Sequence, residues 1–238
     1  MHQVRLDGVS AGYPNRAVLD RLTLRIPALT STAVVGPNGS GKSTLLGVIA
    51  GVIQVTAGKV EHRTDSRVAF VTQRSRAADV LPLTVRDAVA MGRWGRSGLW
   101  RRLSRQDWDV VEATMSRLGI GALAHRQLGE LSGGQRQRAL VAQGLAQEAE
   151  LLLLDEPTSG VDAAAQRIVA DVLAEVVGEG VTVVQATHDF EVAGSAGHLL
   201  LLQDGRLWGE GAPQEVLTVD AIDEIWQLPP RRNHVDKR

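Results

Sequence analysis

Nine consecutive residues decide the fold of this chain: Gly36-Pro37-Asn38-Gly39-Ser40-Gly41-Lys42-Ser43-Thr44. They satisfy G-x-x-x-x-G-K-[ST], a glycine-rich loop whose backbone N–H groups turn inward and bind phosphate at the start of a helix. An apolar run at residues 33–35 precedes the loop and a helix-like run at residues 45–50 follows it, which is the context the pattern requires. We therefore expect an ATP-type site, with Lys42 between the β- and γ-phosphates and the Ser43 hydroxyl on Mg²⁺. A plain glycine turn before a helix is the simpler alternative.

Composition limits the class of protein. The chain has 238 residues, 44% of them hydrophobic and 22% charged, which suffices for one large α/β domain. The net charge of −1 gives no overall attraction to nucleic acid, so no nucleic-acid partner is expected. The absence of cysteine excludes disulfides and thiolate metal sites. No signal-peptide pattern and no apolar run of about 20 residues is present, so we expect a cytoplasmic protein whose membrane span, if needed, is supplied by another subunit.

Alternating and apolar runs predict a parallel α/β core. Strands are expected at residues 22–26, 32–35, 59–61 and 67–71. Fully apolar strands are expected at residues 151–154 and 181–184, as in a parallel sheet buried on both faces. A helix over residues 163–177, ended by Gly178, connects these two strands, and strand–helix–strand alternation favours a parallel sheet.

Helical texture dominates residues 84–129, and a hairpin is expected near the C-terminus. Trp108, Val111, Met115 and Leu118 recur at helical spacing, which predicts a stripe packed in the core. Asp204-Gly205 between two apolar runs is a hairpin signal.

An acidic pair, Asp155-Glu156, follows the four-leucine run at residues 151–154. Open α/β sheets bind ligands at the carboxyl ends of their strands, where this pair falls. We expect Asp155 to hold Mg²⁺, mostly through water, and Glu156 to polarise the attacking water. An exposed acidic pair at a strand end is the alternative.

Residues 131–135, Leu131-Ser132-Gly133-Gly134-Gln135, form a second candidate anion site. Ser132 is expected to cap the helix that follows, and the glycines leave its first N–H groups uncovered. Because one chain has little use for two such sites, we expect two chains to pack head to tail, each closing on the other's ATP. A simple N-cap with a glycine turn is the alternative.

These motifs resemble those of the ATP-binding cassette (ABC) ATPases and occur along the chain in that family's order, and the resemblance spans nearly the whole chain. Residues 36–44 match Walker A, residues 151–156 match Walker B, and residues 131–135 match the family signature, which is far more specific than a P-loop. The resemblance implies an α/β P-loop NTPase core with a mainly parallel sheet, an N-terminal antiparallel β subdomain and an inserted helical signature subdomain at about residues 84–145. It implies one domain over residues 1–228, followed by a polar tail over residues 229–238.

Several single residues match further family elements, and the resemblance implies their roles. Gln73 matches the Q-loop, expected to touch Mg²⁺ and to sense a membrane subunit. Asp162 falls in the D-loop, His188 matches the switch histidine at the γ-phosphate, and Tyr13 stands where the family stacks a ring on adenine. Alone, each has an ordinary structural alternative. The chain departs from the family at Gln143-Gly144, where Arg-Ala is common, so no basic contact is expected there.

The resemblance implies an ATP-driven clamp. Lys42, Glu156 and His188 are the expected catalytic residues, with Ser43, Gln73 and Asp155 around Mg²⁺. ATP would lie between the P-loop of one copy and the signature of a second, so that a homodimer closes on ATP and reopens after hydrolysis.

The expected role is the ATPase subunit of an importer. The sequence contains no second cassette, coiled-coil insertion or fused membrane span, which favours a stand-alone subunit on the cytoplasmic face of the cell membrane. Its partners would be a separate permease and, indirectly, an extracytoplasmic solute-binding protein. Residues 81–103 resemble the ATPases of zinc and manganese importers, and less closely those for iron chelates. An exporter subunit and a soluble scaffold ATPase of the iron–sulfur assembly type remain alternatives.

Overall fold

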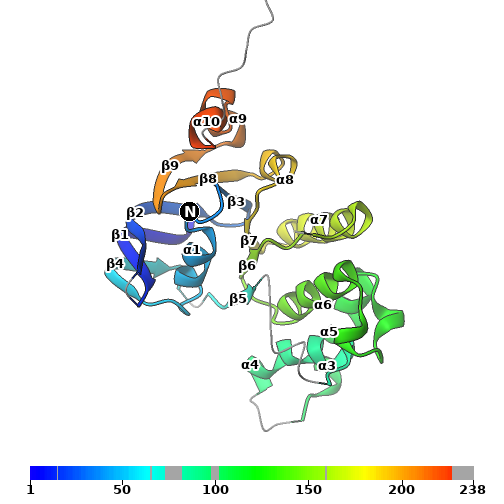
Figure 1. Ribbon diagram of the computed structural model, residues 1–238. Coiled ribbons are helices and arrows are strands. Elements are labelled where there is room, and N and C mark those ends of the chain that lie inside the picture. The colour runs from blue at the N-terminus through cyan, green and yellow to red at the C-terminus, as the bar shows by residue number, and fades with distance from the viewer. Residues whose placement is uncertain (15, 65, 73–81, 98–101, 159, 227–238) are drawn as a thin grey trace, which may run out of the picture.

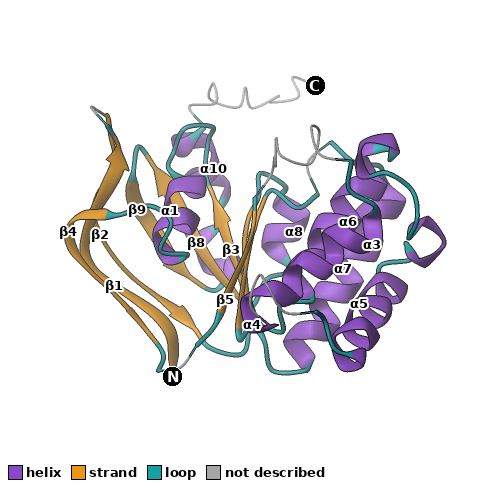
Figure 2. Ribbon diagram, turned by 90° about the horizontal axis from the view of Figure 1, so that it is seen from below, coloured by secondary structure: helices purple, strands orange, loops and turns teal. Residues whose placement is uncertain are grey.

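The computed structural model describes residues 1–14, 16–64, 66–72, 82–97, 102–158 and 160–226 (Figure 1). Two sheets and a group of helices form three layers, with the larger sheet in the middle (Figure 2). Gln73 and the predicted tail at residues 229–238 lie outside the described residues. No helix in the described part combines the length and apolarity needed to cross a membrane.

The smaller sheet is antiparallel and comes from the N-terminal part of the chain. Its order is β2-β1-β4, where β1 is His2–Tyr13, β2 is Arg16–Pro27 and β4 is Val55–His62. The strands predicted at residues 22–26 and 59–61 lie within β2 and β4. Strand β1 was not predicted from the sequence, and its pairing is interrupted by bulges against both neighbours.

The larger sheet has the order β5-β6-β7-β3-β8-β9. Its strands are β3 (Ser31–Val35), β5 (Val68–Val71), β6 (Leu151–Asp155), β7 (Thr182–Ala186), β8 (His198–Gln203) and β9 (Arg206–Gly211). All neighbours are parallel except β9, which pairs antiparallel with β8 through the predicted Asp204-Gly205 hairpin. The sheet is therefore mainly parallel, as predicted.

The packing of strand β6 explains why residues 151–154 are all apolar. Leu151 and Leu153 pack on the side of the antiparallel sheet and α1 (Lys42–Ile49), whereas Leu152 and Leu154 pack on the opposite side. Both faces of the strand are thus covered, so no polar alternation is possible.

The remaining helices cover the face of the larger sheet that lies opposite α1. Between β5 and β6 lie α3 (Val85–Ala90), η1 (Met91–Arg93), α4 (Trp94–Ser97), α5 (Arg105–Arg117), η2 (Gly121–Leu123), η3 (Leu128–Glu130) and α6 (Gly133–Leu145). They are followed by α7 (Ala163–Gly178), α8 (Phe190–Gly194), α9 (Pro213–Val216) and α10 (Val219–Ile225). The stripe on α5 is internal as predicted: Val111, Met115 and Leu118 are fully buried and Trp108 packs at its edge.

One helix boundary differs from the prediction. Gly178 is the last residue of α7 rather than its terminator, and Glu179 is the C-cap. The left-handed turn that ends the segment falls at Gly180, with a φ of +94°. Glycine spacing alone could not tell which of the two glycines makes the turn.

Candidate active site

The glycine-rich loop runs from the end of β3 to the start of α1, as its sequence predicts. Gly41 is the N-cap of α1 with a φ of +104°, which a side chain disfavours. A Cβ at Gly36 would collide with the carbonyl oxygen of Leu202 on β8. The Gly205 N–H of the β8–β9 turn donates to the Ser40 carbonyl at 3.0 Å and holds the loop from the outside.

Lys42 lies inside the curl of this loop. Its Nζ donates to the carbonyl oxygens of Gly36 at 2.8 Å and Pro37 at 3.1 Å, and the side chain is buried. Burial lowers the pKa of the ammonium, and the nearby charges of Glu156 and Asp155 act against that decrease. The ammonium is thus positioned where phosphate oxygens would replace the loop carbonyls.

Two observations fit a phosphate and a hard cation at this loop. The Ser40 hydroxyl is buried and has no hydrogen-bond partner among the described residues, so a donor is left for an anion. The Ser43 hydroxyl donates to Asp155 Oδ1 at 3.0 Å, which joins the start of α1 to the end of β6. Burial raises the pKa of Asp155, with the Ser43 hydrogen bond acting in the opposite direction. A hydroxyl and a carboxylate are oxygen ligands that Mg²⁺ prefers.

Glu156 adopts an uncommon backbone conformation next to these groups. Its φ is +49°, in the left-handed region that costs a non-glycine residue roughly 1–2 kcal/mol. The Glu156 N–H donates to the Ala186 carbonyl at 3.0 Å, which ties the turn to the end of β7. His188, just beyond β7, is exposed and brings Nδ1 to 3.7 Å from Glu156 Oε1. The residues expected to polarise water and to contact the γ-phosphate are therefore neighbours.

Eight of the predicted residues line one pocket of about 240 Å³. Its lining contains Tyr13, Asn38, Gly39, Gly41, Lys42, Ser43, Thr44 and Glu156, together with Arg16 and Val18. Asp155 and His188 adjoin it through their contacts with Ser43 and Glu156. Tyr13 is half exposed at the mouth, at the end of β1.

Arg16 also lines the pocket and was not predicted from the sequence. It begins β2 and pairs directly with Tyr13 across the β1–β2 hairpin. The available signal in the sequence was a positively charged residue close to Tyr13, the ring predicted to stack on adenine. Only the register of the β1–β2 hairpin shows that Arg16 and Tyr13 line the same wall of the pocket.

The predicted signature forms the N-terminus of α6, on the opposite side of the larger sheet from α1. Ser132 is the N-cap: Gln135 N–H donates to its hydroxyl at 3.3 Å, and Ser132 N–H donates to the Gln135 side chain at 3.1 Å. Ser132 and Gly133 are exposed, and Leu131 packs against the helical core. None of these residues lines the P-loop pocket.

Asp162 has a structural role in addition to the one predicted for it. Its Oδ1 accepts a hydrogen bond from Ala165 N–H at 2.9 Å and caps α7. A Cβ at Gly134 would lie 3.3 Å from Asp162 Oδ2 and 3.0 Å from Ala165 Cβ, so the glycine lets the first turns of α6 and α7 approach. Gln73 cannot be placed, because it lies outside the described residues.

A family profile and individual relatives of known function place the chain in the same family. The family profile described as ABC transporter matches residues 19–159. The manganese transport system ATP-binding protein of Bacillus subtilis is 34% identical over 234 residues, covering 95% of this chain and 93% of that protein. The zinc transport system ATP-binding protein of Treponema pallidum is 34% identical over 247 residues, covering 99% of this chain and 93% of that protein.

A solved structure extends the likeness to the fold. The inward-facing conformation of an ABC transporter described as of the metal-chelate type contains a chain with 31% sequence identity and a TM-score of 0.87. The alignment covers 96% of this chain and 90% of that one.

Proposed function

This chain belongs to the ABC transporter family of ATPases, and we propose that it energises import of a divalent metal, manganese or zinc, through a separate membrane permease. Relatives named for manganese and zinc transport align over almost the entire chain, which supports this cargo. The ATPase would act on the cytoplasmic face of the cell membrane, and an extracytoplasmic solute-binding protein would deliver the metal to the permease.

We further propose that the working unit is a homodimer with two shared ATP sites. One observation carries this proposal: the exposed Ser132–Gly133 turn lies outside the pocket of its own P-loop, although the N–H groups of Gly133 and Gly134, in the first turn of α6, suit an anion. A second copy could bring that turn to the open side of the pocket. Groups supplied in trans contribute about 10³–10⁵ in rate in other phosphoryl-transfer enzymes, so closure could gate hydrolysis.

Within each site the roles follow from position. Lys42 and the loop N–H groups would bind the phosphates, and Ser43 and Asp155 would hold Mg²⁺, which would neutralise phosphate charge. Glu156 would orient the attacking water, and His188 would contact the γ-phosphate beside it. Tyr13 would stack on adenine at the mouth. Gln73 and Asp162 would report the state of the site to the permease and to the second copy.

Mixed dimers test the shared site. Lys42→Ala removes the phosphate ligand, and Ser132→Arg places bulk and charge at the signature. Each variant alone should lose ATPase activity. Mixing them in equal amounts should make about half of the dimers mixed, each with one intact site, and so restore about a quarter of the parent rate. No recovery above the two single variants would refute a shared site. Ser132→Ala, which removes only the cap, is the control for damage to α6.

Uptake measurements test the cargo. Cells lacking this protein should lose high-affinity uptake of radioactive manganese or zinc, and the parent gene should restore it while Glu156→Gln should not. Loss of ferric-chelate uptake alone would indicate an iron-chelate importer instead. Normal uptake of all three, with co-purification of soluble partners only, would favour a scaffold ATPase.

A further inference from the structure

The turn between β8 and β9 inserts one buried residue beside the P-loop. Asp204 and Arg206 are exposed, whereas Gly205 between them is buried. Gln203 pairs with Arg206 across the turn, and φ is +47° at Asp204 and +75° at Gly205, the combination that a type I′ hairpin requires. The P-loop follows β3, which is the neighbour of β8 in the larger sheet. The strand order therefore brings this turn to the ATP site.

Gly205 connects two other elements through its own backbone. Its N–H donates to the Ser40 carbonyl of the P-loop at 3.0 Å, and its carbonyl accepts from the N–H of Asp20 on β2 at 3.0 Å. The Arg206 guanidinium next to it donates to the Asp20 carboxylate at 2.6 and 3.0 Å. The turn thus joins the P-loop to β2, a strand that contributes two residues to the pocket lining.

The hydrogen bond to Ser40 sets the direction of the Ser40–Gly41 peptide. A trans peptide points its C=O and its N–H in opposite directions. Because the Ser40 carbonyl faces Gly205, the Gly41 N–H faces away from Gly205. Gly41 lines the ATP pocket, whereas neither Ser40 nor Gly205 does, so this N–H is directed toward the pocket. Among the described residues nothing accepts a hydrogen bond from it, and it suits a phosphate oxygen at the start of α1.

The space around the turn allows only glycine. A Cβ at Gly205 would overlap the carbonyl oxygen of Val18 on β2, and the φ of +75° disfavours a side chain. A Cβ at Gly41 would lie 3.7 Å from Gly205 Cα, so the P-loop is equally close on the other side. Packing this tight leaves the turn a single position relative to the loop, which lets it hold a peptide in one orientation.

We propose that Gly205 is a positioning residue for nucleotide binding, whose N–H holds the Ser40–Gly41 peptide so that the Gly41 N–H meets a phosphate oxygen. The inference rests on the P-loop being the ATP site, and it adds to that site a backbone group from a distant part of the chain. A hydrogen bond to a charged group contributes roughly 10- to 100-fold in affinity, so misalignment of this N–H should be measurable in ATP binding.

Replacement of the Gly205 N–H by an oxygen tests the hydrogen bond itself. Gly205→glycolic acid removes the donor and keeps the carbonyl that binds β2. In the full-length chain, calorimetry should show the Kd for ATP and the Kd for inorganic tripolyphosphate each rising at least fivefold. The KM for ATP should rise with them while kcat changes less than twofold, because the lost contact holds the phosphates in the ground state and the transition state alike.

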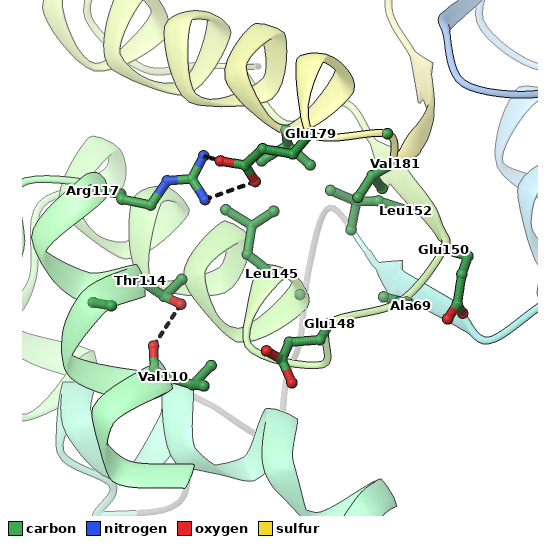
Figure 3. A pocket seen from close by; sticks show the side chains of 15 residues that line it. Ala69, Val110, Thr114, Arg117, Leu145, Glu148, Glu150, Leu152, Glu179 and Val181 are labelled. Atoms are coloured by element: carbon green, nitrogen blue, oxygen red, sulfur yellow. Dashed lines mark hydrogen bonds and ion pairs between the residues drawn. The ribbon is translucent and has the colours of Figure 1, made fainter. Parts of the chain in front are cut away.

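Gly180 provides the matched control. Its φ is +94° and its N–H donates to the Val177 carbonyl at 3.0 Å, so Gly180→glycolic acid removes a hydrogen bond of the same length from another turn glycine. Gly180 lies in the lining of a separate cavity of about 480 Å³ between α5, α6 and α7, where Figure 3 labels its neighbours Glu179 and Val181. This variant should lose a similar amount of thermal stability and keep the parent Kd for both ligands.

Alanine variants repeat the test with ordinary mutagenesis. Gly205→Ala should displace the turn from Val18 and raise the KM for ATP at least tenfold. Gly180→Ala introduces a side chain at a similar φ, but its nearest described contact would be Leu29 Cδ2 at 4.0 Å, and it should leave the KM unchanged.

Three results would overturn the proposal: the parent Kd for ATP in Gly205→glycolic acid, weaker ATP binding with unchanged tripolyphosphate binding, or equal weakening by the Gly180 control. Lys42→Ala separates this proposal from its premise. Parent-like ATP binding by Lys42→Ala would refute the P-loop as the ATP site. Lost binding in Lys42→Ala with none lost in Gly205→glycolic acid would refute only the positioning role.

Discussion

Replacing Arg93 with methionine should destabilise the fold more than any surface charge change. Its guanidinium is 4% exposed and donates to Asp107 Oδ1 at 3.0 Å, to Glu148 Oε2 at 2.8 Å and to the Ala146 carbonyl at 2.7 Å. These contacts join η1 to α5 and to the C-terminal end of α6. Gly92 beside it approaches α6 so closely that a Cβ would collide with the Gln143 carbonyl, so the segment has no room to shift.

The size of the effect follows from which partners can reach water. Asp107 is 11% exposed and would keep a buried charge, whereas Glu148 is 45% exposed and can be hydrated. Removing one partner of a buried pair costs about 3–5 kcal/mol. For a chain of this size, about 1 kcal/mol lowers Tm by about 2–4 °C, so the expected decrease in Tm is roughly 6–20 °C.

Urea unfolding followed by circular dichroism measures this loss, with the m-value checked for two-state behaviour. Arg93→Lys should recover only part of the lost stability, because one ammonium group cannot reproduce the hydrogen bonds of the planar guanidinium. Arg126→Met breaks an exposed pair with Glu130 and should cost at most about 1 kcal/mol. A loss below about 1 kcal/mol for Arg93→Met would show that Asp107 reaches solvent unaided, and the reasoning would fail.

Three further predictions concern the ATP pocket and acid stability. Ser43→Ala should raise the Mg²⁺ concentration needed for half-maximal ATPase activity at least tenfold, because Asp155 loses its hydroxyl partner; an unchanged Mg²⁺ dependence would contradict the assignment. Arg16→Ala should raise the KM for ATP severalfold with little change in kcat, whereas an equal decrease in kcat would argue against a binding role. Hydrogen bonds from Ser104, and then Arg93, lower the pKa of Asp107 to about 2. The stability this carboxylate gives is fully present above about pH 4 and is lost as pH falls toward 2, so the difference in unfolding free energy between the parent and Asp107→Asn should shrink over that interval.

Local patterns were enough to predict the P-loop, the four-leucine strand and the α5 stripe. Each depends on neighbours in sequence: a glycine-rich turn before a helix, a run with no polar face, and a spacing of three to four residues. The family resemblance then placed the acidic pair and the signature in order along one fold. Boundaries were harder to predict. Strand β1 depends on long-range pairing, and at the end of α7 either of two nearby glycines could make the turn.

The sequence by itself determined the phosphate-binding loop, the mainly parallel sheet and the residue types of the site. The loop follows from the conformational freedom of its glycines, and the sheet follows from the spacing of hydrophobic residues. Only the tertiary structure decided that Ser43 meets Asp155, that Arg16 shares a wall with Tyr13, and that the signature turn stands away from its own P-loop. It also revealed the cavity beneath α5, α6 and α7. These are relations between elements far apart in the chain, fixed by strand order and packing, and no local pattern encodes the distance between them.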